Sequence, residues 1–92
     1  MNEELNRTFH QPVRTQIMAY LTAHGLCTYT ALKQKFNLSD GHMTTHMCEL
    51  LEHNYVRMEK EFINNKPCTT YYVTDFGRNE FAEYVIRLKK II

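Results

Sequence analysis

The stretch SDGHMTTHMCELLEHN, residues 39–54, decides the fold predicted for this chain. Apolar side chains recur within it at helical spacing on one face, at Met43, Met47, Leu50 and Leu51. Ser39 stands where an N-cap side chain accepts a backbone N–H group, and Asn54 stands where a left-handed residue commonly follows a helix. The stretch therefore predicts an amphipathic helix with one buried face.

The opposite face of this helix carries short side chains near its N-terminus, at Gly41, His42, Thr45 and Cys48, with Thr44 and His46 on its flanks. Donors and acceptors of this size can read base edges in the major groove of DNA, and Glu49 could accept a hydrogen bond from a cytosine amino group. An ordinary solvated helix surface has the same composition. The elements that flank the helix decide between these two interpretations.

Length and composition indicate one small domain. The 92 residues are 43% hydrophobic, which can supply a modest core. The sequence contains no run of about 18 apolar residues, the length that a membrane-spanning helix needs. The first ten residues are acidic and polar rather than a signal peptide, so we expect a cytoplasmic protein. The cysteines are odd in number and form no CxxC pair, so we expect neither a disulfide framework nor a structural zinc site.

Three helices joined by short links are predicted for the first half of the chain. Pro12 suits the first turn of a helix that Gly25 ends. A brief extended link at residues 27–29 follows, and Thr28 can cap a second helix over residues 30–36. The next residues make the turn into the third helix, which completes a helix-turn-helix.

The apolar period changes from helical to alternating after the third helix. Residues 56–62 alternate apolar and charged side chains like a half-exposed strand, and residues 68–73 alternate again. Asn64 and Asn65 between them tolerate the left-handed backbone of a tight turn, so the two strands should form a hairpin. Thr74 can then cap a last helix.

This order of elements predicts an α+β fold that is mainly α with a small β-hairpin: a winged helix-turn-helix with an additional C-terminal helix, in one domain over residues 1–92. Three segments resemble the short winged-helix transcriptional regulators close to the MarR-like and ArsR-like groups. They are Pro12-x-Arg14, LSDGHMTTHMCELLEHNYV (residues 38–56) and KPCTTYYVTDFGR (residues 66–78). The resemblance implies a DNA-binding dimer with its third helix in the major groove and its wing over the neighbouring minor groove or phosphates.

Two sets of site residues follow. Contacts with double-stranded DNA are expected from the third helix and the wing tip, at Gly41, His42, Thr44, Thr45, His46, Glu49, Asn64, Asn65 and Lys66. A homodimer interface is expected from the last helix (residues 75–92) and an N-terminal arm (residues 1–10), because the apolar stripe of that helix is longer than a small core can cover. Its predicted residues are Leu5, Phe9, Phe81, Tyr84, Val85, Leu88 and Ile92.

Other chemistry has weaker support in the sequence. His42 and His46 are four residues apart and could share a metal, but no third ligand accompanies them, so we expect no metal and no other cofactor. A sensing role for the Cys48 thiol stays open, although no basic neighbour in sequence would activate it. A small-molecule effector also stays open, although none is evident. Nucleophile-elbow, Walker and HExxH motifs are missing, which predicts a non-enzyme.

Two functions therefore remain from the sequence. The first is a sequence-specific, homodimeric transcriptional regulator that binds DNA. The second is a winged-helix module that binds another protein through its third helix or wing. The net charge of only +1 favours the second, because phosphate contacts from Lys and Arg usually dominate DNA affinity. The short polar groups on the third helix favour the first.

Overall fold

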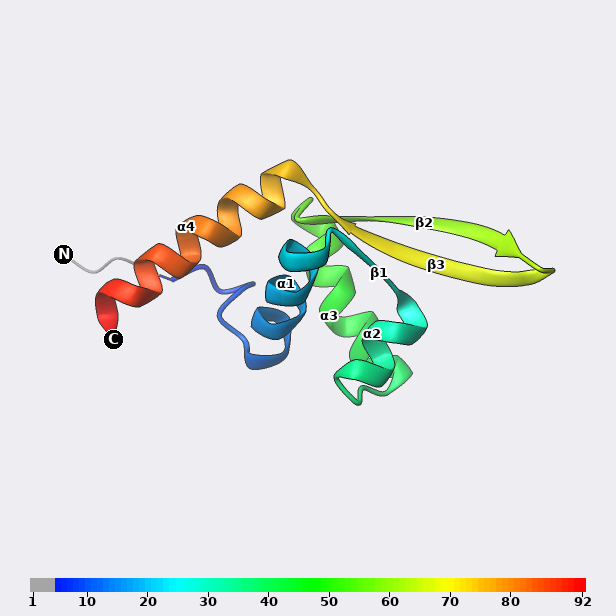
Figure 1. Ribbon diagram of the computed structural model, residues 1–92. Helices are drawn as coiled ribbons and strands as arrows, with labels where there is room; N and C mark the ends of the chain where they lie inside the picture. The colour runs from blue at the N-terminus through cyan, green and yellow to red at the C-terminus, as the bar shows by residue number, and fades with distance from the viewer. Residues whose placement is uncertain (1–4) are drawn as a thin grey trace.

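A computed structural model describes residues 5–92 of the chain (Figure 1). Its helices and strands follow in the order α1 (Pro12–His24), β1 (Leu26–Thr28), α2 (Tyr29–Lys35), α3 (Asp40–Glu52), β2 (Val56–Ile63), β3 (Lys66–Val73) and α4 (Asp75–Ile91). The fold is a winged helix-turn-helix with an additional C-terminal helix, as the sequence predicted. None of the helices in the described part is long and apolar enough to cross a membrane.

Short polar side chains begin the helices where the sequence predicted them. Thr28 accepts a hydrogen bond from the Ala31 amide at the start of α2, and Ser39 accepts one from the His42 amide at the start of α3. Each bond satisfies a backbone donor that has no partner within its own helix. Beyond α3, Asn54 has a left-handed backbone with φ of 59°.

The core lies between the three N-terminal helices and the inner face of the sheet. Its fully buried side chains are Phe9, Ile17, Met18, Leu21, Leu32, Met43, Met47 and Leu50. The α3 stripe predicted from the sequence is thus buried at three of its four positions, and Leu51 packs against its edge. Burial on one face of α3 leaves the other face exposed to solvent.

The sheet has three antiparallel strands in the order β1-β3-β2. The prediction of an unpaired link at residues 27–29 is wrong. Leu26–Thr28 is a strand that pairs with β3, with Cys27 opposite Tyr71. Both of these side chains are buried, so this face of the sheet covers the helices. We call it the helix-side face and the opposite one the outer face.

The β2–β3 hairpin extends beyond the core as the wing (Figure 1). Asn64 and Asn65 form its two-residue turn with φ of 53° and 63°, the left-handed conformations that such turns require. The prediction of a half-exposed strand at residues 56–62 is wrong past Val56. From Arg57 to Pro67 both faces of the hairpin are exposed, because no helix lies against this part.

The start of α4 is fixed against the end of α3. The Thr74 hydroxyl accepts a hydrogen bond from the Gly77 amide and lies 2.7 Å from the Asn54 carbonyl oxygen. A Cβ atom at Gly77 would lie only 2.0 Å from the Tyr55 carbonyl oxygen, so only glycine allows this close approach. From this point α4 extends on the side opposite the wing (Figure 1), and its Phe81 and Tyr84 join the core.

Candidate DNA-binding surface

The N-terminal half of α3 exposes a row of small polar groups to solvent. Gly41, His42, Thr44 and Thr45 are all exposed, as is Cys48 one turn further along. The hydroxyls of Thr44 and Thr45 each donate to a carbonyl one turn back, at 3.0 Å. Their protons are therefore occupied, and their oxygens face solvent as hydrogen-bond acceptors.

The carboxylate of Asp40 at the N-terminus of α3 is bound by two side chains of α2. Asp40 pairs with Lys33 of α2 at 2.7 Å, and it also accepts a hydrogen bond from the Tyr29 hydroxyl at 2.5 Å. Lys33 first, and Tyr29 second, hold the pKa of the Asp40 carboxyl below its ordinary value. This carboxylate is thus neutralised beside the exposed row of α3, where a free negative charge would repel DNA phosphates.

Two predicted DNA contacts on α3 are bound within the protein instead. His46 is half-buried, and its Nδ1 atom lies 3.1 Å from Nη1 of Arg14 on α1. Glu49 accepts a hydrogen bond from the Thr8 hydroxyl at 3.4 Å. Both side chains lie on the flank that packs against α1 and the N-terminal segment, so we remove His46 and Glu49 from the predicted contacts.

The predicted wing-tip residues lie together at the far end of the hairpin. Asn64, Asn65 and Lys66 are all exposed. Sequence reasoning missed Phe62 beside them, whose side chain is 81% exposed. It was assigned to a half-exposed strand, and only the distance of the wing tip from the helices shows that nothing covers it.

The structure corrects part of the predicted dimer interface. Phe9, Phe81 and Tyr84 are buried within the protomer itself, and the ring of Phe9 lies 4.3 Å from that of Tyr55. Phe9 of the N-terminal segment reaches the core, where its ring lies against those of Phe81 and Tyr84 of α4. Side chains already buried in this way are not available to a partner.

The distal half of α4 keeps the remaining part of the stripe. Val85 and Leu88 are half-buried, whereas Ile91 and Ile92 are 62% and 89% exposed. At 3.6 residues per turn, Leu88, Ile91 and Ile92 continue the face that Phe81 and Tyr84 bury. The stripe therefore runs past the end of the core. The predicted stripe ran from Leu88 directly to Ile92 and so left out Ile91.

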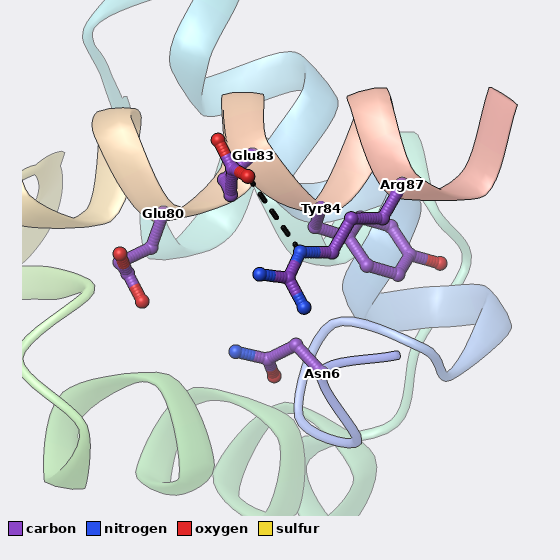
Figure 2. A pocket seen from close by; sticks show the side chains of 5 residues that line it. All are labelled: Asn6, Glu80, Glu83, Tyr84 and Arg87. Atoms are coloured by element: carbon purple, nitrogen blue, oxygen red, sulfur yellow. Dashed lines mark ion pairs between the residues drawn. The ribbon is translucent and has the colours of Figure 1, made fainter. Parts of the chain in front are cut away.

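A polar pocket of about 310 Å³ lies between the N-terminal segment and α4. Figure 2 shows its lining residues, Asn6, Glu80, Glu83, Tyr84 and Arg87, with Arg87 Nε 3.6 Å from Glu83 Oε1. Ligand sites are mostly lined by apolar side chains with a few polar groups, and this lining is largely charged. The pocket gives no specific support to an effector.

The histidine pair on α3 lacks the geometry of a metal site. The ring centroids of His42 and His46 are 6.5 Å apart, and His46 Nδ1 is already occupied by Arg14. Within residues 5–92, no three His, Cys, Asp or Glu side chains are grouped to hold a metal ion. All three cysteines are free thiols, of which Cys48 is exposed.

Comparison with known proteins identifies the family. The profile of a family described as "Winged helix DNA-binding domain" matches residues 13–92. The chain belongs to this winged-helix family. An uncharacterized protein of Methanocaldococcus jannaschii is 31% identical to the winged-helix chain over 85 residues, which cover 92% of each protein. This family consists of DNA-binding domains rather than enzymes, in agreement with the prediction from the sequence.

Solved structures share the winged-helix fold over most of the chain. A transcriptional regulator homologue from Pyrococcus horikoshii OT3 superposes with a TM-score of 0.87 at 26% identity, over 94% of this chain and 85% of the other. A MarR-family regulator from Porphyromonas gingivalis W83 has a TM-score of 0.61 at 13% identity, over 97% and 94%. An ArsR-family regulator shares the fold with a TM-score of 0.66 at 13% identity. The chain thus belongs to a family of winged-helix DNA-binding domains and shares its fold with transcriptional regulators, among them members of the MarR and ArsR families.

Proposed function

We propose that the protein is a sequence-specific transcriptional regulator that binds DNA as a homodimer, with α3 in the major groove. The exposed row on α3 is the observation that carries this proposal. His42, Thr44 and Thr45 present a ring and two hydroxyls that can bond base edges. The buried methionines behind them fix the helix on the core, so these groups are held in place before DNA arrives.

The distal half of α4 supports the dimer. Leu88 is half-buried and Ile91 and Ile92 are exposed, so together they form an apolar strip that the protomer covers only in part, and a strip of this kind is typical of an interface. Two-fold pairing along it, with Leu5 and Val85 at its edge, would present two copies of α3 to successive major grooves about 34 Å apart. Pairing also doubles the positive charge offered to phosphates, which partly offsets the low net charge.

The wing tip completes the proposed contacts with DNA. Asn64, Asn65 and Lys66 offer two amides and one ammonium group, which suit phosphate oxygens better than base edges. A regulator of this kind works where the DNA is, which in a cell without a nucleus is the cytoplasm. The pocket beside Arg87 gives no specific support to a small-molecule effector. The proposed DNA binding does not require an effector.

A selection experiment tests the proposed function. The full-length protein is incubated with a pool of random 30-base-pair duplexes, and bound duplexes are enriched over several rounds and sequenced. We expect a motif with two related half-sites about one helical turn apart, bound at least about 1,000-fold more tightly than random duplex. Binding without any enriched motif would reject sequence-specific regulation, and a protein that binds no duplex would favour a protein-binding module.

A further inference from the structure

The helix α3 contains no side chain that reads a base with two parallel hydrogen bonds. Arg and Lys bind guanine in this way, and Asn and Gln bind adenine. None of these four residue types occurs between Asp40 and Glu52. If α3 reads bases, it does so through smaller groups, which are the ring of His42 and the hydroxyl and methyl groups of Thr44 and Thr45.

The hydrogen bonds of the two threonines determine which partner each hydroxyl can take. Thr44 Oγ1 lies 3.0 Å from the Asp40 carbonyl oxygen, and Thr45 Oγ1 lies 3.0 Å from the Gly41 carbonyl oxygen. A carbonyl oxygen only accepts and a hydroxyl has one proton, so both hydroxyls are the donors in these bonds. Each hydroxyl therefore keeps only lone pairs for a base, and these require a donor on the DNA.

Both threonines are also held in position before DNA arrives. Met43 and Met47 are buried, which fixes the helix on the core while Thr44 and Thr45 stay exposed on its other side. The bond from each hydroxyl to the preceding turn selects one of the few χ1 rotamers that threonine has in a helix. The two accepting oxygens therefore have defined positions on the exposed face of α3.

The base pairs differ in the groups that they present in the major groove. Adenine and cytosine each present an amino group, guanine presents two acceptors, and thymine presents an acceptor and a methyl group. An accepting threonine oxygen bonds to an amino group and is repelled by the acceptors of guanine. The methyl group of threonine packs on that of thymine. An A·T pair thus matches both groups of a threonine, whereas a G·C pair matches only its oxygen.

We propose that Thr44 and Thr45 select A·T base pairs, with their hydroxyl oxygens accepting from adenine amino groups and their methyl groups packing on thymine methyl groups. This inference rests on the proposed function and names the base pairs that the same site prefers. The half-site opposite the two threonines contains A·T pairs, and a guanine whose acceptors face these oxygens is excluded.

Two variants at each threonine separate the hydroxyl contact from the methyl contact. The probe is the 30-base-pair duplex that the wild-type protein enriches from the random pool. Thr45→Val keeps the branched shape and removes the acceptor, whereas Thr45→Ser keeps the hydroxyl and removes the methyl group. Thr44→Val and Thr44→Ser form the second pair. Valine should weaken binding about 3- to 10-fold, the value of one hydrogen bond, and serine about 4-fold, the value of one buried methyl group.

Modified duplexes then identify the base group that each variant no longer contacts. In one series each adenine in turn is replaced by methyladenine, whose methyl group takes the place of the amino hydrogen that faces the major groove. In the other series each thymine is replaced by uracil, which lacks the methyl group. Within the half-site, methyladenine should weaken the wild-type protein much more than a valine variant, and uracil should weaken it much more than a serine variant. A purely structural role of the threonines would instead give additive losses, the same on every duplex.

The outcomes separate this inference from the proposed function. If the wild-type protein enriches no motif, the proposed function fails and the inference fails with it. If it enriches a motif but neither methyladenine nor uracil weakens its binding, the assignment of A·T pairs alone is overturned. Deazaguanine, which lacks one of the two major-groove acceptors of guanine, tests the alternative. A loss on deazaguanine that disappears in Thr44→Val or Thr45→Val would mean that a threonine donates to guanine, and would also overturn the assignment.

Discussion

The guanidinium group of Arg14 on α1 lies 3.1 Å from Nδ1 of His46 on α3. A guanidinium group can only donate, so Nδ1 must accept and the imidazole is neutral. Arg14 also donates from Nε to the Thr8 carbonyl oxygen at 2.6 Å, which fixes its position. The neutral ring of His46 therefore helps join α3 to α1 and the N-terminal segment.

This arrangement predicts a loss of stability in mild acid. Burial first, and then the charges of Arg14 and His42, hold the pKa of His46 below its ordinary value. The unfolded chain, with a pKa of about 6.5, then binds the proton more readily than the folded one. Stability should be complete above pH 6.5 or so and should fall as the pH drops from there toward the lowered folded pKa.

Urea unfolding at pH 7.5 and pH 5.5 measures this effect. His46→Gln keeps an acceptor for Arg14 but cannot titrate, so its free energy of unfolding should change less between the two pH values than that of the wild-type protein. His53→Gln is the control, because His53 lies exposed just beyond α3. Equal pH dependence in His46→Gln and wild type would refute the prediction.

A second prediction concerns the close approach of α4 to Tyr55. Gly77→Ala places a methyl group 2.0 Å from a backbone oxygen that cannot rotate away. We expect a loss of about 1–3 kcal/mol, the usual cost of overpacking. Gly41→Ala is the matched control, since its methyl group would meet only the Ser39 hydroxyl oxygen at 3.9 Å. Alanine there should stabilise α3 by up to about 1 kcal/mol. Urea unfolding of both variants gives the comparison.

A third prediction concerns base reading by α3. Replacing His42 and Thr45 together by alanine should weaken binding to the selected duplex by about 1–3 kcal/mol for each good hydrogen bond to a base that the change removes. Affinity for random duplex should stay nearly constant, because that affinity comes from phosphate contacts. Gel-shift titrations at two salt concentrations measure both values. A similar weakening on both duplexes would mean that these side chains do not read bases.

A fourth prediction concerns the dimer. Leu88→Asp would bury a charge in the proposed interface and should give a folded monomer with much weaker binding to the two-half-site duplex. Ile86→Asp is the control, because Ile86 is 50% exposed and lies on a different side of α4. Sedimentation at micromolar concentration gives the mass, and circular dichroism checks the fold. A monomeric wild-type protein under these conditions would exclude the interface.

The sequence predicted the features that depend on neighbouring residues. Helix caps at Thr28, Ser39 and Thr74 and the left-handed turn at Asn64 each require only local chemistry, and all four are present. The strand β1 escaped prediction because three residues are too few to show a period. It exists because Cys27 pairs across the sheet with Tyr71, a partner distant in sequence.

The limits of the site prediction have the same origin. Periodicity shows that one side of a helix is apolar, but it does not show which neighbour covers that side. Phe81 and Tyr84 were therefore assigned to a partner, although Phe9 of the same chain covers them, with its ring 5.3 Å from that of Phe81. The wing shows the reverse error. The alternation of residues 56–62 predicted that one face of the strand is covered, but Phe62 on that strand is 81% exposed.

The close packing at Gly77 also gives α4 the mechanics of a lever. Its 17 residues make a rod about 25 Å long that is held by the core from Gly77 to Tyr84 and is exposed at Ile91 and Ile92. A bend of roughly 10° beyond Tyr84 would move the far end by about 2 Å, which follows from the rise per residue between Tyr84 and Ile91. In the proposed dimer the two rods meet at these far ends. In that dimer, bending of α4 beyond Tyr84 would change the separation of the two copies of α3.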